Sequence, residues 1–151
     1  MIDYKKAILI IKKNKIKINS ETILSINSIN RVSSSNIYSP SNYPAANNSS
    51  FDGYAINSKE TKNLTKKKFE KFKILKTIAA GDNPNIKKVP KYSTIEVMTG
   101  AMIQKPFDTV IPIEQINFVR SKDDTRYIII NKKIKKNEFI RFKGSDYKKG
   151  E

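Results

Sequence analysis

The stretch NNSSFDGYAI, at residues 47–56, runs from polar residues through an Asp-Gly pair directly into an apolar segment. Asp-Gly pairs are typical of tight turns, because aspartate bonds to nearby backbone and glycine adopts positive φ without strain. We therefore expect a turn with Gly53 at positive φ, followed by a strand at residues 54–56. The turn places the Asp52 carboxylate at the mouth of that strand, where it either only stabilises the turn or has a chemical function.

Short apolar segments separated by turn signals continue from this stretch to residue 142. Strands are expected at residues 69–78, 93–98, 108–113, 115–120, 127–131 and 138–142. Gly- and Pro-containing turn clusters lie between several of them, at residues 79–84 and 99–101. Short strands with this spacing predict a small, mostly β domain with a barrel-like or sandwich architecture over residues 46–142.

The residues before this region have a helical and extended character. Residues 1–13 place apolar side chains at helical spacing among lysines, with Asp3 as the expected N-cap. Residues 20–32 repeat isoleucine at similar spacing but are rich in serine and asparagine, which form helices poorly. Residues 14–19 are expected to form a short strand or an extended link, and residues 37–38 a brief strand. The sequence therefore predicts an α+β protein.

Composition restricts the possible chemistry. The chain has 151 residues, enough for one ordinary domain or two small ones, and it contains no cysteine and no histidine. Disulfides, thiolate or imidazole metal sites and Ser-His or Cys-His catalysis are therefore excluded. Any metal must be a hard cation such as Mg²⁺ on oxygen ligands. The apolar run at residues 7–11 is too short to span a bilayer and resembles no signal peptide, so we expect a cytoplasmic protein with no membrane partner.

The formal net charge is +16 at pH 7. Such a charge is compatible with a solvated lysine-rich surface, with an anionic small-molecule ligand or with a nucleic-acid partner. Lysine is spread along the whole chain together with abundant isoleucine and asparagine, a pattern typical of coding-composition bias. No basic motif interleaved with aromatic residues is present. We therefore favour the solvated surface and keep a basic nucleic-acid-binding module as an alternative function.

Four groups of motifs follow one another along the chain. They are Pro44 with NSSFDGYA at residues 48–55, AAGD at 79–82, VMTGA at 97–101 with DTVIPIE at 108–114, and RFKGSD at 141–146 with KGE at 149–151. Their order and approximate spacing resemble those of the molybdopterin molybdenumtransferase family, which includes the E domain of gephyrin. The resemblance covers essentially the whole chain, but only the N-terminal portion of the family's architecture.

The resemblance implies a domain organisation. Residues 1–45 and 143–151 would form a discontinuous, incomplete helical first domain, and residues 46–142 a β-rich second domain inserted in it. Family members usually continue into an α/β domain that holds much of the molybdopterin site, and then into a C-terminal β-barrel; both are absent from this chain. In the family the site lies between the subunits of a dimer. We therefore expect a homodimer or a complementing chain that carries the α/β domain.

The resemblance also implies a function in molybdenum cofactor biosynthesis. The family inserts molybdenum from molybdate into the dithiolene of adenylated molybdopterin and releases AMP, with Mg²⁺ as cofactor. These are the substrates and the cofactor that we expect. Because much of the site would lie in the α/β domain, this transferase chain is not expected to be sufficient alone. A non-catalytic role as a dimerisation or scaffold fragment is a further alternative.

Six residues on the matched motifs form the expected site. Asp52, Thr99 and Asp146 are expected to act in catalysis, and Asp52 is also the expected Mg²⁺ ligand, because Mg²⁺ prefers one or two carboxylates with retained waters. The Thr99 hydroxyl and neighbouring backbone N–H groups can bind an oxygen of phosphate or molybdate. Each residue also has a structural alternative, since such side chains often only satisfy their own turn. The expected substrate-binding residues are Ser50, Gly100 and Glu114.

Overall fold

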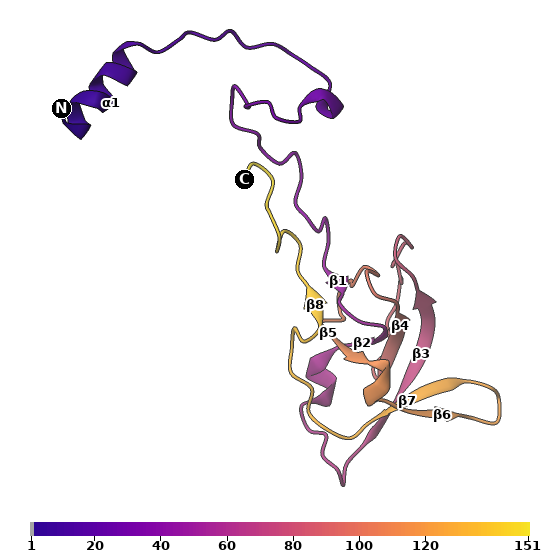
Figure 1. Ribbon diagram of the computed structural model, residues 1–151. Helices are drawn as coiled ribbons and strands as arrows, with labels where there is room; N and C mark the ends of the chain where they lie inside the picture. Colours follow the sequence, from indigo (N-terminus) through magenta and orange to yellow (C-terminus); the bar gives the residue numbers. More distant parts are fainter. Residues whose placement is uncertain (1) are drawn as a thin grey trace. The chain divides into compact units, whose positions relative to one another are not determined.

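Strands make up most of the regular structure. The computed structural model describes residues 2–151, and its contacts divide the chain into two units, Met1–Ile37 and Tyr38–Glu151. The first unit contains one α-helix and one 3-10 helix, whereas the strands of the described residues all lie in the second (Figure 1). The expectation of a mostly β domain is therefore confirmed.

The N-terminal helix forms where the apolar spacing predicts it. Helix α1 spans Tyr4–Lys13, with Asp3 as the N-cap residue in extended conformation. Asp3 thus occupies the predicted N-cap position, but its side chain makes no capping hydrogen bond. Nowhere in residues 2–151 is there a helix of the length and apolarity needed to cross a bilayer.

The second predicted helix, over residues 20–32, is wrong. Only the 3-10 helix η1 (Ser25–Asn27) forms in this segment. Serine and asparagine have low helix propensity, and an isolated helix of this length needs packing to persist. The apolar side chains of Ile26 and Ile29 are exposed, so they supply no such packing within this unit. Residues 14–19 are an extended link, and the brief strand predicted at residues 37–38 does not form.

A six-stranded sheet is the main element of the second unit. Its strands are β2 (Gly53–Ile56), β3 (Glu70–Ile78), β4 (Ser93–Val97), β5 (Thr109–Pro112), β6 (Asn117–Arg120) and β7 (Arg126–Ile130). The strand order is β5-β2-β4-β3-β7-β6, and only β3 and β4 are parallel. Strands β5 and β6 lie at opposite ends of this order, so the sheet is open and not closed into a barrel. The sheet is curled, and the β6–β7 hairpin extends from it (Figure 1).

Four shorter elements complete this unit. Strand β1 (Asn48–Ser49) pairs with β8 (Ile140–Arg141) in a separate two-stranded sheet. The 3-10 helix η2 (Ser58–Thr61) follows β2, and η3 (Ile113–Gln115) follows β5. These elements border the turns that carry the motifs.

The core consists of two apolar clusters. Alternation along β2 separates them, because Tyr54 and Ile56 belong to one cluster and Ala55 to the other. In β3, however, Ile74 and Ile78 belong to different clusters although they are four positions apart, an offset that normally places two side chains on the same face of a strand. The register against β4 shifts between Ile74 and Thr77. This irregularity inserts one extra residue and reverses the side on which the rest of β3 packs.

Gly53 is essential to the sheet for a reason other than the predicted one. Its φ is not in the left-handed region, so the expected positive φ is wrong. Gly53 instead lies between two strands, opposite Val97 on β4 and Pro112 on β5. A Cβ at this position would lie 2.9 Å from the Ile111 carbonyl carbon and still closer to its oxygen. The close approach of β5 therefore excludes any side chain.

The two ends of the second unit run beside each other. The backbone N–H of Ser39 donates to the Glu151 carbonyl (2.9 Å) and that of Gly144 to the Pro44 carbonyl (2.9 Å). Between them the rings of Tyr43 and Tyr147 stack at 5.4 Å. This pairing is the geometry that an inserted domain needs at its junction. The assignment of residues 1–45 and 143–151 to one discontinuous domain stays a prediction.

We predict that Gly53→Ala lowers the free energy of unfolding by about 2–3 kcal/mol, because the new methyl group forces β5 away from β2. Gly81→Ala is the matched control. Gly81 has φ +90° but no atom within 4 Å of the added Cβ, so only backbone strain of about 1 kcal/mol is expected. Urea denaturation of the two variants measures the difference. Equal losses would contradict the close-approach explanation.

Candidate functional site

The Asp52 carboxylate is held by Thr99. The Thr99 backbone N–H donates to Asp52 Oδ1 at 2.6 Å, and the Thr99 hydroxyl donates to the same oxygen at 2.7 Å. Both residues are exposed. The backbone hydrogen bond first, and the hydroxyl second, lower the pKa of the Asp52 carboxyl below its ordinary value. Asp52 is therefore an anion at neutral pH, fixed in position and open to solvent.

The turn that carries Thr99 is fixed by backbone hydrogen bonds on both sides. The Met98 N–H donates to the Ile78 carbonyl at 3.0 Å, and the Gly100 N–H donates to the Ser49 carbonyl at 2.9 Å. Gly100 has φ +83°, a conformation that glycine adopts without strain. The turn after β4 is thereby attached both to the end of β3 and to β1, the strand before Asp52.

Two further segments contact the turns that carry Asp52 and Thr99. The Ile113 N–H donates to the Asp52 carbonyl at 3.1 Å, and Glu114 is the next residue on η3. A Cβ on Gly100 would lie 3.3 Å from the Ala80 side chain, so the turn at residues 79–82 packs against the Thr99 turn. Segments from three of the four predicted motif groups thus converge on Asp52.

Ser50 lies on the outer side of this convergence. Its N–H donates to the Phe139 carbonyl at 3.0 Å, and Phe51 and Phe139 form an edge-to-face ring pair at 5.2 Å. Ser50 and Glu114 are exposed at this surface, whereas Tyr54 is fully buried in the core. The structure thus joins the turns that carry Ser50, Asp52, Thr99 and Gly100, and Glu114 follows Ile113, whose N–H donates to Asp52.

Asp146 lies in a different cluster. Its carboxylate pairs with the Arg141 guanidinium and accepts from the Ser145 hydroxyl at 3.1 Å. Arg141 also stacks over the Tyr43 ring, 5.4 Å from its centroid. The ion pair lowers the pKa of Asp146 and raises that of Arg141. Asp146 is connected to the segment before Asp52 through its partner Arg141, which lies on β8 opposite Asn48 on β1.

The donor set at Asp52 offers one carboxylate. No group of three or more acidic side chains suited to a metal occurs among residues 2–151. Mg²⁺ does not need such a group, because it commonly binds one or two carboxylates and keeps several waters. Both hydrogen bonds from Thr99 go to Oδ1, so Oδ2 accepts none from Thr99. An exposed, ionised aspartate of this kind fits a water-rich Mg²⁺ site.

Sequence reasoning missed two features at the other end of β2. The Asp108 carboxylate accepts hydrogen bonds from the Ser58 N–H at 2.7 Å and the Ser58 hydroxyl at 3.0 Å. Next to Ser58 lies a pocket lined mostly by lysines. The two dilysines at residues 132–133 and 135–136 are the sequence feature that could have indicated this pocket. The high lysine content of the whole chain conceals them.

Comparison with known proteins gives a consistent result. Residues 2–151 match the family described as the MoeA N-terminal region, domains I and II. The chain is 35% identical over 127 residues to the molybdopterin molybdenumtransferase of Haemophilus influenzae, covering 81% of this chain and 28% of the relative. It is 29% identical over 150 residues to that of Staphylococcus aureus strain Mu50, covering 99% and 34%.

A solved structure agrees in fold. The crystal structure of the molybdopterin biosynthesis MoeA protein from Pyrococcus horikosii superposes with a TM-score of 0.80 and 26% identity. The superposition covers 99% of this chain and 37% of that one. The chain therefore spans between 28% and 37% of the length of these three relatives.

We predict that Thr99→Val raises the pKa of Asp52 but leaves it below 3.8, because the stronger backbone hydrogen bond remains. A carboxylate with a lowered pKa stabilises the fold fully above its ordinary pKa, and this contribution is lost as the pH falls through the lowered value. NMR titration of the side-chain carboxyl carbon measures the shift. Asp123, which accepts from Ser121 and Thr125, is the internal control and should not change. An unchanged Asp52 pKa would contradict the role of the hydroxyl.

Proposed function

The chain belongs to the MoeA family, whose N-terminal region its residues 2–151 match, and from this membership we propose that it acts in molybdenum cofactor biosynthesis. The proposed reaction is the insertion of molybdenum from molybdate into adenylated molybdopterin with release of AMP. The chain would supply the N-terminal part of the site. The observation that carries the proposal is the ionised Asp52 carboxylate, fixed by Thr99 where the motif turns converge.

Asp52 and Thr99 have complementary roles in this proposal. Thr99 fixes the carboxylate through its N–H and hydroxyl, so Asp52 needs no reorganisation when a ligand arrives. Because Asp52 is exposed and anionic, it can bind a hard cation or accept hydrogen bonds from a substrate. A magnesium ion held by Asp52 and water would neutralise negative charge on the phosphates of adenylated molybdopterin.

The remaining site residues receive proposed roles from their surroundings. The N–H groups of Ser50 and Gly100 already donate to backbone carbonyls, so they are not donors for a substrate. The exposed Ser50 hydroxyl and Glu114 carboxylate are the proposed substrate contacts. Gly100 would contribute the shape of its turn. Asp146 would position Arg141, whose strand pairs with β1 next to the Asp52 turn.

The chain alone is proposed to be insufficient for the reaction. It spans 28% and 34% of the two molybdopterin molybdenumtransferases, so most of such an enzyme has no counterpart in it. The exposed position of Asp52 and Thr99 leaves one side of the site open to another domain. We propose that a homodimer partner or a complementing chain provides that domain.

We predict that a chimera, in which this chain replaces the matched region of the Haemophilus influenzae relative, inserts molybdenum into adenylated molybdopterin. Asp52→Asn should lower its turnover by about 100-fold, because it removes an electrostatic group that the site holds preorganised. The same substitution should also change how the turnover of the chimera depends on the Mg²⁺ concentration. Cofactor formation is followed by reconstitution of a molybdenum enzyme.

Asp123→Asn is the matched control for this experiment. Asp123 is also a hydrogen-bonded carboxylate with a lowered pKa, but it lies in the turn between β6 and β7. Its replacement should leave turnover and Mg²⁺ dependence unchanged. If Asp52→Asn behaved like Asp123→Asn, the proposed role of Asp52 would be excluded.

A further inference from the structure

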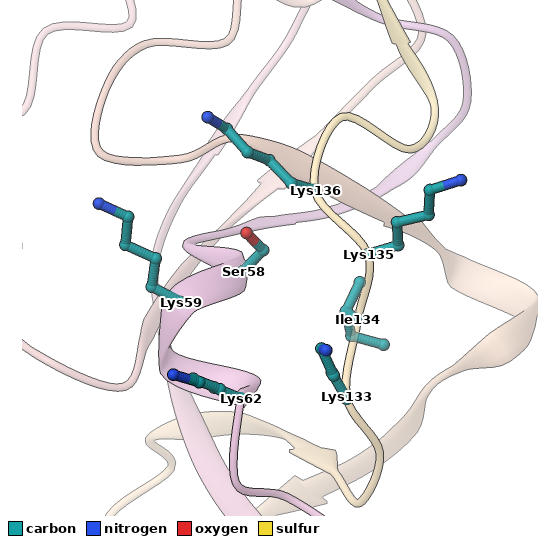
Figure 2. A pocket seen from close by; sticks show the side chains of 7 residues that line it. All are labelled: Ser58, Lys59, Lys62, Lys133, Ile134, Lys135 and Lys136. Atoms are coloured by element: carbon teal, nitrogen blue, oxygen red, sulfur yellow. The ribbon is translucent and has the colours of Figure 1, made fainter.

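A lysine-lined pocket lies next to η2. Its volume is about 740 Å³, and it is lined by Ser58, Lys59, Lys62, Lys133, Ile134, Lys135 and Lys136. Five of the seven lining residues are lysines, whereas lysine and arginine together account for 30 of the 151 residues of the chain. In Figure 2, Lys59 and Lys62 project from η2 on the side away from the facing segment, Lys133 and Lys136 extend from that segment toward the η2 side, and Lys135 is turned away from η2. Positive charge is thus concentrated here beyond the general lysine content.

A buried hydroxyl fixes the two walls of the pocket. Thr61, on η2, is fully buried. Its hydroxyl accepts a hydrogen bond from the Ile134 N–H at 2.9 Å and donates to the Ser58 carbonyl at 2.8 Å. Ile134 is itself buried in the core beneath the facing segment. The lysines therefore project from two backbones whose separation is set by packing and hydrogen bonding.

The acidic groups beside the pocket accept hydrogen bonds from backbone N–H and hydroxyl groups, and among the described residues neither forms an ion pair with a lysine of the pocket. Asp108 accepts two hydrogen bonds from Ser58. Glu60, between Lys59 and Thr61, accepts from the Tyr92 N–H at 2.8 Å and so points toward the start of β4. The ion pairs found within residues 2–151 all involve arginines, and none includes a lysine of this pocket. The positive charge of the pocket is therefore not neutralised by ion pairs within the protein.

The pocket is separate from the Asp52 site. Asp52 precedes β2 and Ser58 follows it, so the two places lie at opposite ends of this four-residue strand. At about 3.3 Å per residue, the strand alone separates them by roughly 13 Å. The lysine pocket is therefore not part of the site to which the proposed function is assigned, and its role can be tested independently.

We propose that this pocket binds a small molecule that carries two or more adjacent phosphate groups. Lysine ammonium groups bind phosphate as compact charges, and like charges that line one pocket repel one another until an anion is bound. A ligand with several phosphates matches this charge better than a single phosphate does. The volume is in the range of small-molecule sites, about 300–1,000 Å³.

The lining favours a small molecule over a nucleic acid. Proteins that bind single strands combine a basic groove with aromatic side chains on which the bases stack. No aromatic residue is among the seven that line the pocket. The pocket can hold phosphates, but it offers no stacking surface for bases.

Calorimetric titration of the 151-residue chain with inorganic tripolyphosphate in 0.15 M NaCl tests the proposal. Saturable one-to-one binding is expected. The triple variant Lys59→Gln, Lys62→Gln, Lys133→Gln should bind at least tenfold more weakly. The control Lys87→Gln, Lys88→Gln, Lys122→Gln removes the same charge from exposed positions outside the pocket, and should change the affinity less than threefold. Asp52→Asn should leave the binding unchanged.

Several results would overturn the proposal. If the two triple variants lost the same affinity for tripolyphosphate, binding would depend on the net charge of the protein and not on this pocket. Equal affinity for orthophosphate and tripolyphosphate would exclude a site for adjacent phosphates. Tighter binding of an oligothymidylate than of tripolyphosphate would assign the pocket to nucleic acid. No binding at millimolar tripolyphosphate would exclude the site altogether.

Discussion

The hydrogen bonds from Thr99 to Asp52 are the interaction on which the arrangement of the candidate site depends. They join the turn before β2 to the turn after β4, and the Asp52 carbonyl accepts from Ile113 at the end of β5. Strand β2 lies between β4 and β5 in the sheet. The three strand ends are therefore held together at one residue, Asp52, whose carboxylate the Thr99 hydrogen bonds keep ionised.

The close approach of β5 to β2 makes this arrangement possible. Because Gly53 carries no side chain, the Ile111 carbonyl can lie against it and bring the end of β5 beside Asp52. The opposite end of β2 is organised in a similar way, since Asp108 holds Ser58 and Thr61 holds Ile134. One short strand thus separates an anionic site from a cationic pocket, and a different carboxylate fixes the backbone at each end.

Local patterns predicted the strands and the family, and the match of residues 2–151 confirms the family. The Asp-Gly turn was also found at the right place, but the reason for Gly53 was wrong, because a contact with Ile111 is not visible in local sequence. The helix over residues 20–32 failed for a related reason: spacing alone does not provide a packing partner. The lysine pocket was missed because its two walls are about 70 residues apart in the chain and come together only in the folded structure, where Thr61 accepts from the Ile134 N–H.

The central claim is that an ionised Asp52 is held by the Thr99 backbone in solution. The most direct measurement is the chemical shift of the Thr99 amide proton as a function of pH. If the claim is correct, this proton titrates together with the Asp52 carboxyl, with a midpoint below 3.8, and moves upfield when the carboxyl is protonated and the hydrogen bond weakens. A Thr99 amide proton that does not titrate, or that titrates with an ordinary aspartate midpoint, would contradict it.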